Sequence, residues 1–472
     1  MNKNTQSCTQ TFFDQLYSTV GRKAVITGTT RTRYYTTGFR FGQGTCCAVV
    51  KPSCLTKLWQ VLKLCVQHDK IIIMQAANTG LNGGSTPFGD DYDREIVIIS
   101  TLNINNLVLL NGGQQVLAFA GATLSSLEDK LKPLNRGPHS VIGSSCIGAS
   151  VIGGVCNNSG GNLLNRGPAY TELSLYAQLD SNGELQLVNH LDIDLGDTPE
   201  QILDNLQQGQ FNHSPGISNN KLASDTEYQQ RVRDISQHTP ARFNADKRRL
   251  FETSGCAGKL AVFAVRLDTY PNPVNEQVFY IGTNKPQTLN SIRQRILTEF
   301  KTLPEMGEYM HRSYFDGSAK YSKDTFLIVK YFGASMLPRL FSYKGHIESV
   351  LEKLPLLPTK LIDHLLQLIT NLLPNHLPRR LLEYRDKFEH HLIIKAVDDS
   401  IEPTRKLLTE VLCENSEGAF LNCNKQEGDA ALLHRFVAGG AYSRYTAINK
   451  NEIGGSLTLD IALPRNSKDW DT

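Results

Sequence analysis

A short apolar strand that runs directly into a glycine-rich loop constrains this chain more than any other part of its sequence. Residues 71–74 are three isoleucines and a methionine, and the loop MQAANTGLNGGSTP occupies residues 74–87. Glycine adopts backbone angles that other residues avoid and leaves room beside the main chain, so such a loop can turn its N–H groups toward an anion. The loop therefore predicts a phosphate ligand, and a doubly charged pyrophosphate suits it best.

A second glycine-rich segment, GSSCIGASVIGGVCNNSGGN, spans residues 143–162 and contains no charged residue. A run of small uncharged residues lets the backbone approach a large planar ligand closely. Either segment alone is typical of tight turns in a β-rich domain, whereas the two together favour a cofactor. The Rossmann fingerprint G-x-G-x-x-G is absent, and Leu260 follows Gly258-Lys259, which excludes a P-loop.

Apolar strands alternate with amphipathic helices between residues 45 and 270 and predict an α+β domain. A helix is predicted over 55–66, and strands are predicted over 96–99 and 116–120. Residues 207–246 are polar and lack periodicity, which predicts a long loop excursion.

A second strand–helix pattern begins near Pro271 and returns much later in the chain. Strands are predicted over 391–397 and 457–463, with a helix over 402–414 between them. We therefore expect one α+β sandwich that is interrupted by an insertion over 311–387.

The insertion has a character of its own. It carries twelve Lys or Arg against seven Asp or Glu, whereas the net charge of the whole chain is only +3. Seven leucines and isoleucines between residues 361 and 373 line one face of a predicted helix. Such a face flanked by bases suits an anionic membrane surface, where each base contributes roughly 1 kcal/mol. A helix that packs its leucines against the protein core is the other interpretation.

Composition excludes several classes of protein. A net charge of +3 does not indicate nucleic-acid binding, and the ten cysteines include no C-x-x-C pair, which is typical of reduced thiols in the cytoplasm. The N-terminus lacks the parts of a secretory signal, and no stretch approaches the ~18 apolar residues of a spanning helix. We expect a soluble protein, or one attached to a membrane only at its surface.

Two long runs of sequence carry a family resemblance. AANTGLNGGSTPFGDDYDREIVIIST and PHSVIGSSCIGASVIGGVCNNSGGNLLNRGPAYTE closely resemble the bacterial quinone-dependent D-lactate dehydrogenases, respiratory flavoproteins of the vanillyl-alcohol-oxidase or PCMH type. Similar stretches continue through residues 37–44, 239–269, 307–312 and 459–466. The resemblance therefore covers essentially the whole chain.

The resemblance implies a PCMH-type FAD-binding domain over residues 1–268 and a discontinuous α+β cap domain over 269–310 and 388–472. The insertion at 311–387 matches the membrane-binding segment of the family. The cofactor implied is FAD, held by the two glycine-rich segments and one later strand. The residues at matching positions are Ala76, Ala77, Asn78, Thr79, Gly80, Gly84, Ser85, Gly143, Ser150, Gly160 and Val262.

The implied reaction is oxidation of D-lactate to pyruvate, with the electrons passed through FAD to a membrane quinone. By the same resemblance, the protein lies peripherally on anionic lipid at the cytoplasmic face of the bacterial inner membrane. Another FAD-linked 2-hydroxy-acid dehydrogenase, acting on glycolate or D-2-hydroxyglutarate, is the alternative within enzymes. Several of those use a zinc site of clustered histidines, and no metal site is predicted from this sequence.

A 2-hydroxy acid requires an arginine for its carboxylate and a base for its hydroxyl proton. The segments FEHHLIIK and LLHRFVAGG supply His390, His391, His434 and Arg435 near the predicted cap. We predict that His391 and Arg435 are the catalytic residues. Because side chains alternate along a strand, at most one of His390 and His391 points into a site.

By resemblance, members of the family continue past the length of this chain into a His-rich segment and a final Asn-Pro-Gly motif that help to complete the active site. This chain ends at Asp471-Thr472 and contains no Asn-Pro-Gly. Two interpretations follow, namely an incomplete record of a full enzyme or a truncated, non-catalytic flavin-binding remnant.

Overall fold

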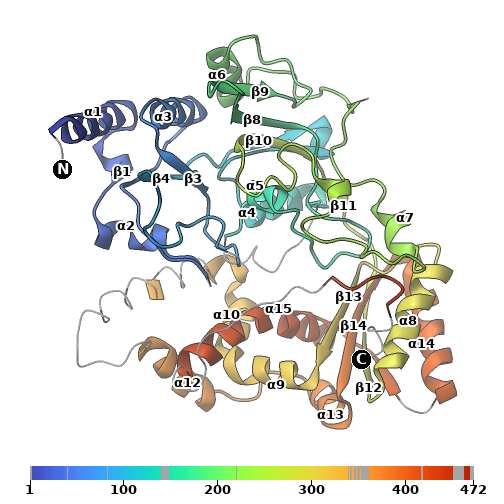
Figure 1. Ribbon diagram of the computed structural model, residues 1–472. Helices are drawn as coiled ribbons and strands as arrows, with labels where there is room; N and C mark the ends of the chain where they lie inside the picture. Colours follow the sequence, from blue (N-terminus) through green and yellow to red (C-terminus); the bar gives the residue numbers. More distant parts are fainter. Residues whose placement is uncertain are drawn as a thin grey trace.

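Three β-sheets of four or five strands organise the chain in the computed structural model, two in the upper half of Figure 1 and one in the lower half. The structure describes residues 3–467 except 40, 82, 140–147, 219, 338, 339, 341, 342, 345, 346, 348–350, 352–360, 416, 417 and 450–461.

The first sheet has the strand order β1-β2-β4-β3, in which β2, β4 and β3 run parallel. Its strands are β1 (Val25–Ile26), β2 (Ala48–Val50), β3 (Ile71–Gln75) and β4 (Ile96–Ser100). Its helices are α1 (Lys3–Val20), α2 (Thr29–Thr36) and α3 (Leu55–Gln67). Helices α1 and α3 pack on one face and α2 on the other, because consecutive parallel-strand residues are buried on both sides.

The second sheet is antiparallel, with the order β5-β6-β10-β8-β9. Its strands are β5 (Leu107–Leu110), β6 (Gln115–Phe119), β8 (Ser174–Leu179), β9 (Leu185–Asn189) and β10 (Ala261–Asp268). Its helices are α4 (Leu124–Leu131), α5 (Val151–Cys156) and α6 (Pro199–Gln208). A small pair joins β7 (Arg136–Gly137) to β11 (Tyr270–Pro271).

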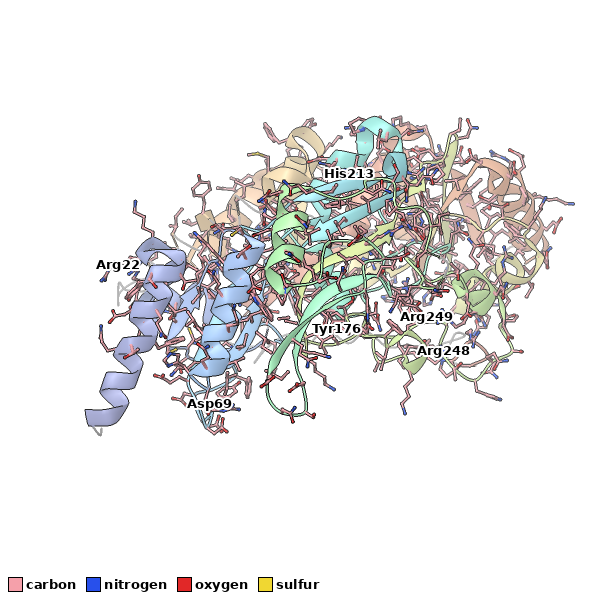
Figure 2. All side chains as sticks on the ribbon, turned by 90° about the horizontal axis from the view of Figure 1, so that it is seen from above. Arg22, Asp69, Tyr176, His213, Arg248 and Arg249 are labelled. Atoms are coloured by element: carbon pink, nitrogen blue, oxygen red, sulfur yellow. The ribbon has the colours of Figure 1, made fainter. Side chains whose placement is uncertain are left out.

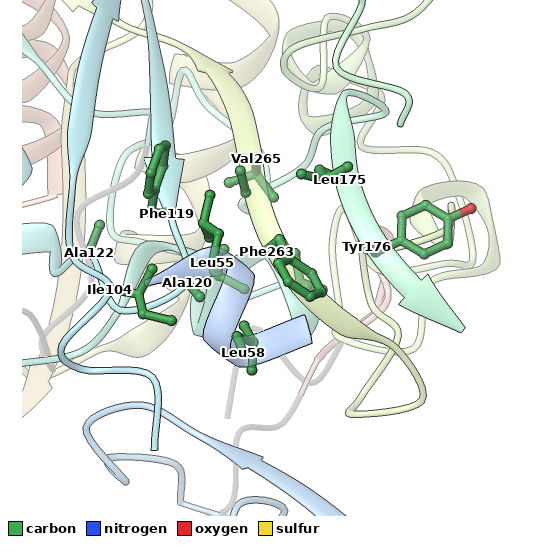
Figure 3. Packing of buried hydrophobic residues seen from close by; sticks show 14 of the residues in the cluster. Leu55, Leu58, Ile104, Phe119, Ala120, Ala122, Leu175, Tyr176, Phe263 and Val265 are labelled. Atoms are coloured by element: carbon green, nitrogen blue, oxygen red, sulfur yellow. The ribbon is translucent and has the colours of Figure 1, made fainter. Parts of the chain in front are cut away.

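One hydrophobic core joins these two sheets. Leu55 and Leu58 of α3 lie beside Phe119 of β6 and Phe263 of β10 (Figure 3). Helix α3 connects β2 to β3 of the first sheet, and it also packs against the second sheet. The two sheets are therefore parts of one packed unit rather than independent layers.

The polar segment at 207–246 differs from the predicted loop because it contains the helix α7 (Tyr228–Arg233). Arg231 and Arg249 both pair with the buried carboxylate of Asp225, and the Nη2 of Arg249 lies 2.7 Å from Asp225 Oδ1. These ion pairs order a stretch whose composition alone gives no periodic signal. Arg249 lies toward the end of the molecule opposite α1 and Arg22 (Figure 2).

The third sheet has the order β13-β14-β12-β15, with each neighbouring pair antiparallel. Its strands are β12 (Glu276–Thr283), β13 (Met306–His311), β14 (His390–Val397) and β15 (Gly418–Asn422). Helices α8 (Pro286–Glu299) and α14 (Ile401–Asn415) cover one face. The strand predicted over 457–463 lies mostly outside the described residues.

The other face of this sheet carries helices from the insertion and one long helix that follows it. These are α9 (Arg312–Tyr321), α10 (Lys323–Phe332), α13 (Arg379–Lys387) and α15 (Lys425–Ile448). Helix α12 (Leu361–Leu372) packs in turn on α9, α10 and α15. Helix α15 packs against α9 along much of its length in Figure 1. Within the described residues, no helix combines the length and the apolar composition that a membrane span requires.

Candidate active site

The glycine-rich loop after β3 is closed by the side chain of Gln75, the last residue of that strand. Gln75 is buried, and its Nε2 donates hydrogen bonds to the carbonyl oxygens of Tyr35, at 2.9 Å, and Ser85, at 2.6 Å. The second bond joins the two ends of the loop. The strand thereby fixes where the loop leaves the sheet and where it returns.

Asn78 braces the loop from within. Its φ of 54° lies in the left-handed region, its Nδ2 donates to the carbonyl of Thr37 at 2.8 Å, and its Oδ1 accepts from Ser85 Oγ at 2.8 Å. The hydrogen bonds that hold the loop in shape are thus made by the side chain of Asn78, and its backbone N–H is not needed for them. Among the described residues, the backbone N–H groups of Asn78, Thr79 and Gly80 have no hydrogen-bond partner.

The two glycine-rich segments meet in space. Gly148 has a φ of 91°, and a Cβ added to it would lie 3.7 Å from the Cβ of Ala77. Ser150 is buried and begins α5, since its Oγ accepts a hydrogen bond from the N–H of Gly153 at 3.0 Å. Gly143 lies outside the described residues.

These residues fit a bound FAD. The unpartnered N–H groups at 78–80 form a cradle for a pyrophosphate, and the close approach of Gly148 continues the cradle toward the second segment. Val262 is buried in the core at an irregularity in the pairing of β10 with β8, so its predicted contact with FAD would have to come from its backbone. The individual FAD contacts stay predictions.

Gly160 contacts an arginine that the sequence did not single out. A Cβ at position 160 would lie 2.7 Å from the guanidinium carbon of Arg242, and Arg242 donates a hydrogen bond to the carbonyl of Gly161. Arg242 therefore lies flat on the second glycine-rich segment. Its Nη1 is buried and has no hydrogen-bond partner within the part of the chain that the structure describes.

Arg435, predicted to bind the substrate, projects from α15 toward the same region. Its Nη2 lies 2.9 Å from Oε2 of Glu308 on β13. Burial raises the pKa of Glu308, while the positive charges of Arg435 and Arg242 act in the opposite direction. The three charges thus lie where the third sheet runs beside the end of the second glycine-rich segment, to which it is joined by the hydrogen bond from Leu164 N to the carbonyl of Glu305. Glu308 and Arg242 both lie in stretches that carry the family resemblance, which is the signal that could have found them.

His391 lies elsewhere. It is fully buried on β14, 5.5 Å from the ring of Tyr280 and 6.0 Å from that of Phe315, whereas His390 points to the other face and contacts Tyr309. Alternation therefore separates the two histidines as predicted. Burial lowers the pKa of His391 to about 4. Because Tyr280 and Phe315 enclose this ring, its burial opposes the role of base, which stays a prediction.

Comparison with solved structures defines the class of fold. p-Cresol methylhydroxylase with bound substrate aligns with a TM-score of 0.54 at 12% identity, over 94% of this chain and 72% of that chain. Alkyldihydroxyacetonephosphate synthase aligns with a TM-score of 0.52 at 11% identity, over 90% of this chain and 62% of that one. The fold is that of the PCMH-type FAD flavoproteins, as predicted.

Comparison of sequences defines the family. The model for an FAD binding domain matches residues 47–187, and the model described as "D-lactate dehydrogenase, membrane binding" matches residues 278–472. The quinone-dependent D-lactate dehydrogenase of Escherichia coli is 52% identical over 470 residues, covering 100% of this chain and 82% of that protein. That of Haemophilus influenzae is 50% identical, covering 98% and 82%. The chain belongs to this family, its cofactor is FAD, and its membrane association is peripheral.

The bracing of the loop by Asn78 gives a first prediction. Asn78→Ala removes both side-chain hydrogen bonds and places alanine at a positive φ, so FAD should bind about tenfold or more weakly. Asn78→Gly loses only the hydrogen bonds and should have a smaller effect. Flavin fluorescence titration of the apoprotein measures both affinities. Equal affinity in Asn78→Ala and the unaltered protein would contradict the bracing.

The buried histidines give a second prediction, for stability against pH. Burial lowers the pKa of His391 and His376 to about 4 and that of His434 to about 3, from 6.5 when unfolded. The unfolded chain therefore binds more protons below pH 6.5, and stability should fall as the pH decreases from 6.5 toward 4. At pH 5, each of these histidines lowers the free energy of unfolding by about 2 kcal/mol.

Urea unfolding followed by circular dichroism at pH 7 and pH 5 measures this loss. His391→Leu should reduce the difference between the two pH values by about 2 kcal/mol. Replacement of the exposed His213 by leucine is the matched control and should leave the difference unchanged. If both variants keep the full pH dependence, the assignment to His391 is wrong.

Proposed function

We propose that this chain oxidises D-lactate to pyruvate and passes the two electrons to a membrane quinone. The observation that carries the proposal is the similarity of the whole chain to the enzymes of Escherichia coli and Haemophilus influenzae. FAD, when bound, accepts the hydride of the substrate α-carbon and relays the electrons. The protein itself must bind the substrate, orient it and remove the hydroxyl proton.

Arg435 and Arg242 bind the substrate carboxylate in this proposal. Each keeps one buried nitrogen without a hydrogen-bond partner among the described residues, Nε in Arg435 and Nη1 in Arg242. An unpaired N–H group in a buried site is costly, and a carboxylate oxygen would satisfy it. Arg242 also touches the Gly160–Gly161 backbone, so a substrate held there lies beside the predicted flavin contacts.

Glu308 takes the hydroxyl proton in this proposal, in place of His391. Its pKa is raised by burial, which makes the carboxylate a stronger base than an exposed glutamate. Arg435 lies 2.9 Å away, and its positive charge favours the ionised form of the carboxylate. Removal of this proton as the hydride leaves lets the C–O bond of lactate become the carbonyl of pyruvate.

Two substitutions test these roles. Glu308→Gln should lower kcat/KM for D-lactate by about 100-fold or more through loss of the base, with the spectrum of bound flavin unchanged. Arg435→Lys should chiefly raise KM, because lysine cannot form the paired contact. Anaerobic stopped-flow bleaching of the flavin by D-lactate measures both. Glu389→Gln, a matched change at the residue before β14 of the same sheet, should retain the unaltered rate.

The same assay separates the alternatives. Faster bleaching by glycolate or D-2-hydroxyglutarate than by D-lactate would show that the assignment of D-lactate as the substrate is wrong. Bound flavin that stays oxidised under excess of all three acids would indicate a non-catalytic flavin-binding protein.

We further propose that α12 lies on anionic lipid at the cytoplasmic face of the membrane. Its polar residues face inward: Asp363, Gln367 and Thr370 are buried. Four of its apolar residues face outward: the exposed fractions are 50% for Leu365, 62% for Leu368, 55% for Ile369 and 86% for Leu372. This arrangement is the reverse of a helix that packs on a core, and it supports the membrane interpretation of the leucines.

Polar bonds hold α12 in this orientation. Asp363 pairs with Lys344, Gln367 Nε2 donates to the carbonyl of Lys320 at 2.9 Å, and Arg444 donates to Thr370 Oγ1 at 3.4 Å. The leucines are therefore available to lipid without any rearrangement. The excess of bases in the insertion favours an anionic surface.

Vesicle co-sedimentation tests the lipid contact. Leu368→Ser together with Leu372→Ser should weaken binding to phosphatidylglycerol vesicles about tenfold or more, since two exposed leucines no longer enter the lipid. Leu179→Ser, on the exposed end of β8, is the matched control. Binding of the unaltered protein should fall with added salt. Equal binding to neutral and anionic vesicles would contradict the preference for anionic lipid.

A further inference from the structure

A cavity of about 250 Å³ lies between α9 and α15, apart from the flavin-binding segments. Its walls come from these two helices alone, and tyrosine is the most frequent residue in them. The lining residues are Ser313, Gly317, Tyr321, Ala441, Tyr442 and Tyr445.

The tyrosines around the cavity form an aromatic layer. Tyr314 stacks on Tyr442 with ring centroids 5.0 Å apart and planes at 15°, and Tyr445 lies edge-on to Tyr321 at 5.3 Å. Tyr442 and Tyr445 are 6.2 Å apart and join the two pairs. Aromatic walls at these spacings favour a flat ring as the guest.

Gly317 keeps the cavity open. A Cβ at this position would lie 3.2 Å from the hydroxyl oxygen of Tyr442, so even alanine would crowd the ring. Burial raises the pKa of Tyr442, which keeps its phenol protonated and able to donate a hydrogen bond. The cavity thus offers flat apolar walls and a donor for a carbonyl oxygen.

One end of the aromatic layer reaches the charged site. The guanidinium of Arg435 lies 5.8 Å from the centroid of Tyr314, and Arg435 pairs with Glu308. Arg242, whose charge also acts on Glu308, rests on Gly160. The cavity is therefore linked to the second glycine-rich segment by contacts as far as Glu308 and by the charge of Arg242 beyond it.

The other end lies beside the lipid-facing helix. Gln367 of α12 bonds to the carbonyl of Lys320, which precedes Tyr321, and Arg444, which precedes Tyr445, pairs with Asp324 at 2.7 Å and with Thr370 of α12. The cavity is thus placed between the exposed leucines of α12 and the flavin-binding segments.

We propose that this cavity binds the ring of the membrane quinone, an inference that rests on the proposed function. Its volume is just below the ~300–1,000 Å³ of small-molecule sites, which suits a quinone ring with its isoprenoid tail left outside along α12. Reduction of the quinone to quinol consumes the two electrons released when D-lactate becomes pyruvate, together with two protons. The carbonyl oxygens of the ring become the hydroxyls of the quinol.

The test uses the FAD-loaded full chain and a short-chain ubiquinone as acceptor. Tyr442→Ala removes a stacking wall and Gly317→Val fills the space, so each should raise KM for the quinone about tenfold or more. Tyr442→Phe keeps the wall and should restore most of the affinity. Tyr34→Ala, an exposed tyrosine of α2, is the matched control. Flavin bleaching by D-lactate and turnover with ferricyanide should be unchanged in all four variants.

The two half-reactions separate the possible failures. Failure of D-lactate to bleach the flavin of the unaltered protein would overturn the proposed function. Normal bleaching with an unchanged KM for quinone in both Tyr442→Ala and Gly317→Val would overturn the quinone site alone. Loss of activity with ferricyanide as well as quinone would mean that the substitutions disturb the charged site, which also overturns a separate quinone site.

Discussion

The antiparallel pairing of β13 with β14 determines where the side chains on and around the third sheet lie. His311 at the end of β13 is the direct partner of His390 at the start of β14, so the insertion leaves the sheet and returns to it at one point. Its helix α9 consequently folds back over the face that carries Glu308, where α15 also packs. The charges proposed to bind the substrate, the aromatic layer and the helix proposed to face lipid are thus all positioned by this one sheet.

The sequence predicts most accurately where the signal is local. Strand β3 and the loop that follows it come from adjacent residues, and the structure has the strand only one residue longer than predicted. Helix α15 has no such signal, although it is 24 residues long. It contacts β12, α9, α10 and α12, and Ala430, Ala431 and Ala438 are all buried. A helix enclosed on several sides lacks the apolar stripe on which prediction depends.

The residues proposed to be catalytic show a different limit of prediction. Alternation separates His390 from His391, but it cannot tell which face of β14 is sealed by other elements. His391 is enclosed by Tyr280 and Phe315, whereas Glu308, on the same face of the neighbouring strand, lies beside Arg435. The ion pair between Glu308 and Arg435 joins β13 to α15, which begins more than 100 residues later in the chain. Its geometry depends on the whole cap, and family resemblance marks only the stretch that contains Glu308.

The inverted polarity of α12 links membrane attachment to the aromatic layer. If its leucines packed inward, aliphatic side chains would occupy the space beside Tyr321 and Tyr445. Instead, Gln367 and Thr370 bond to the ends of α9 and α15, and these polar contacts hold the helix without filling the cavity. Each leucine left outside forgoes about 1.5–3 kcal/mol of burial. In the proposed membrane contact, insertion of those leucines into lipid would recover that free energy and would stabilise the same orientation of α12 that leaves the cavity open.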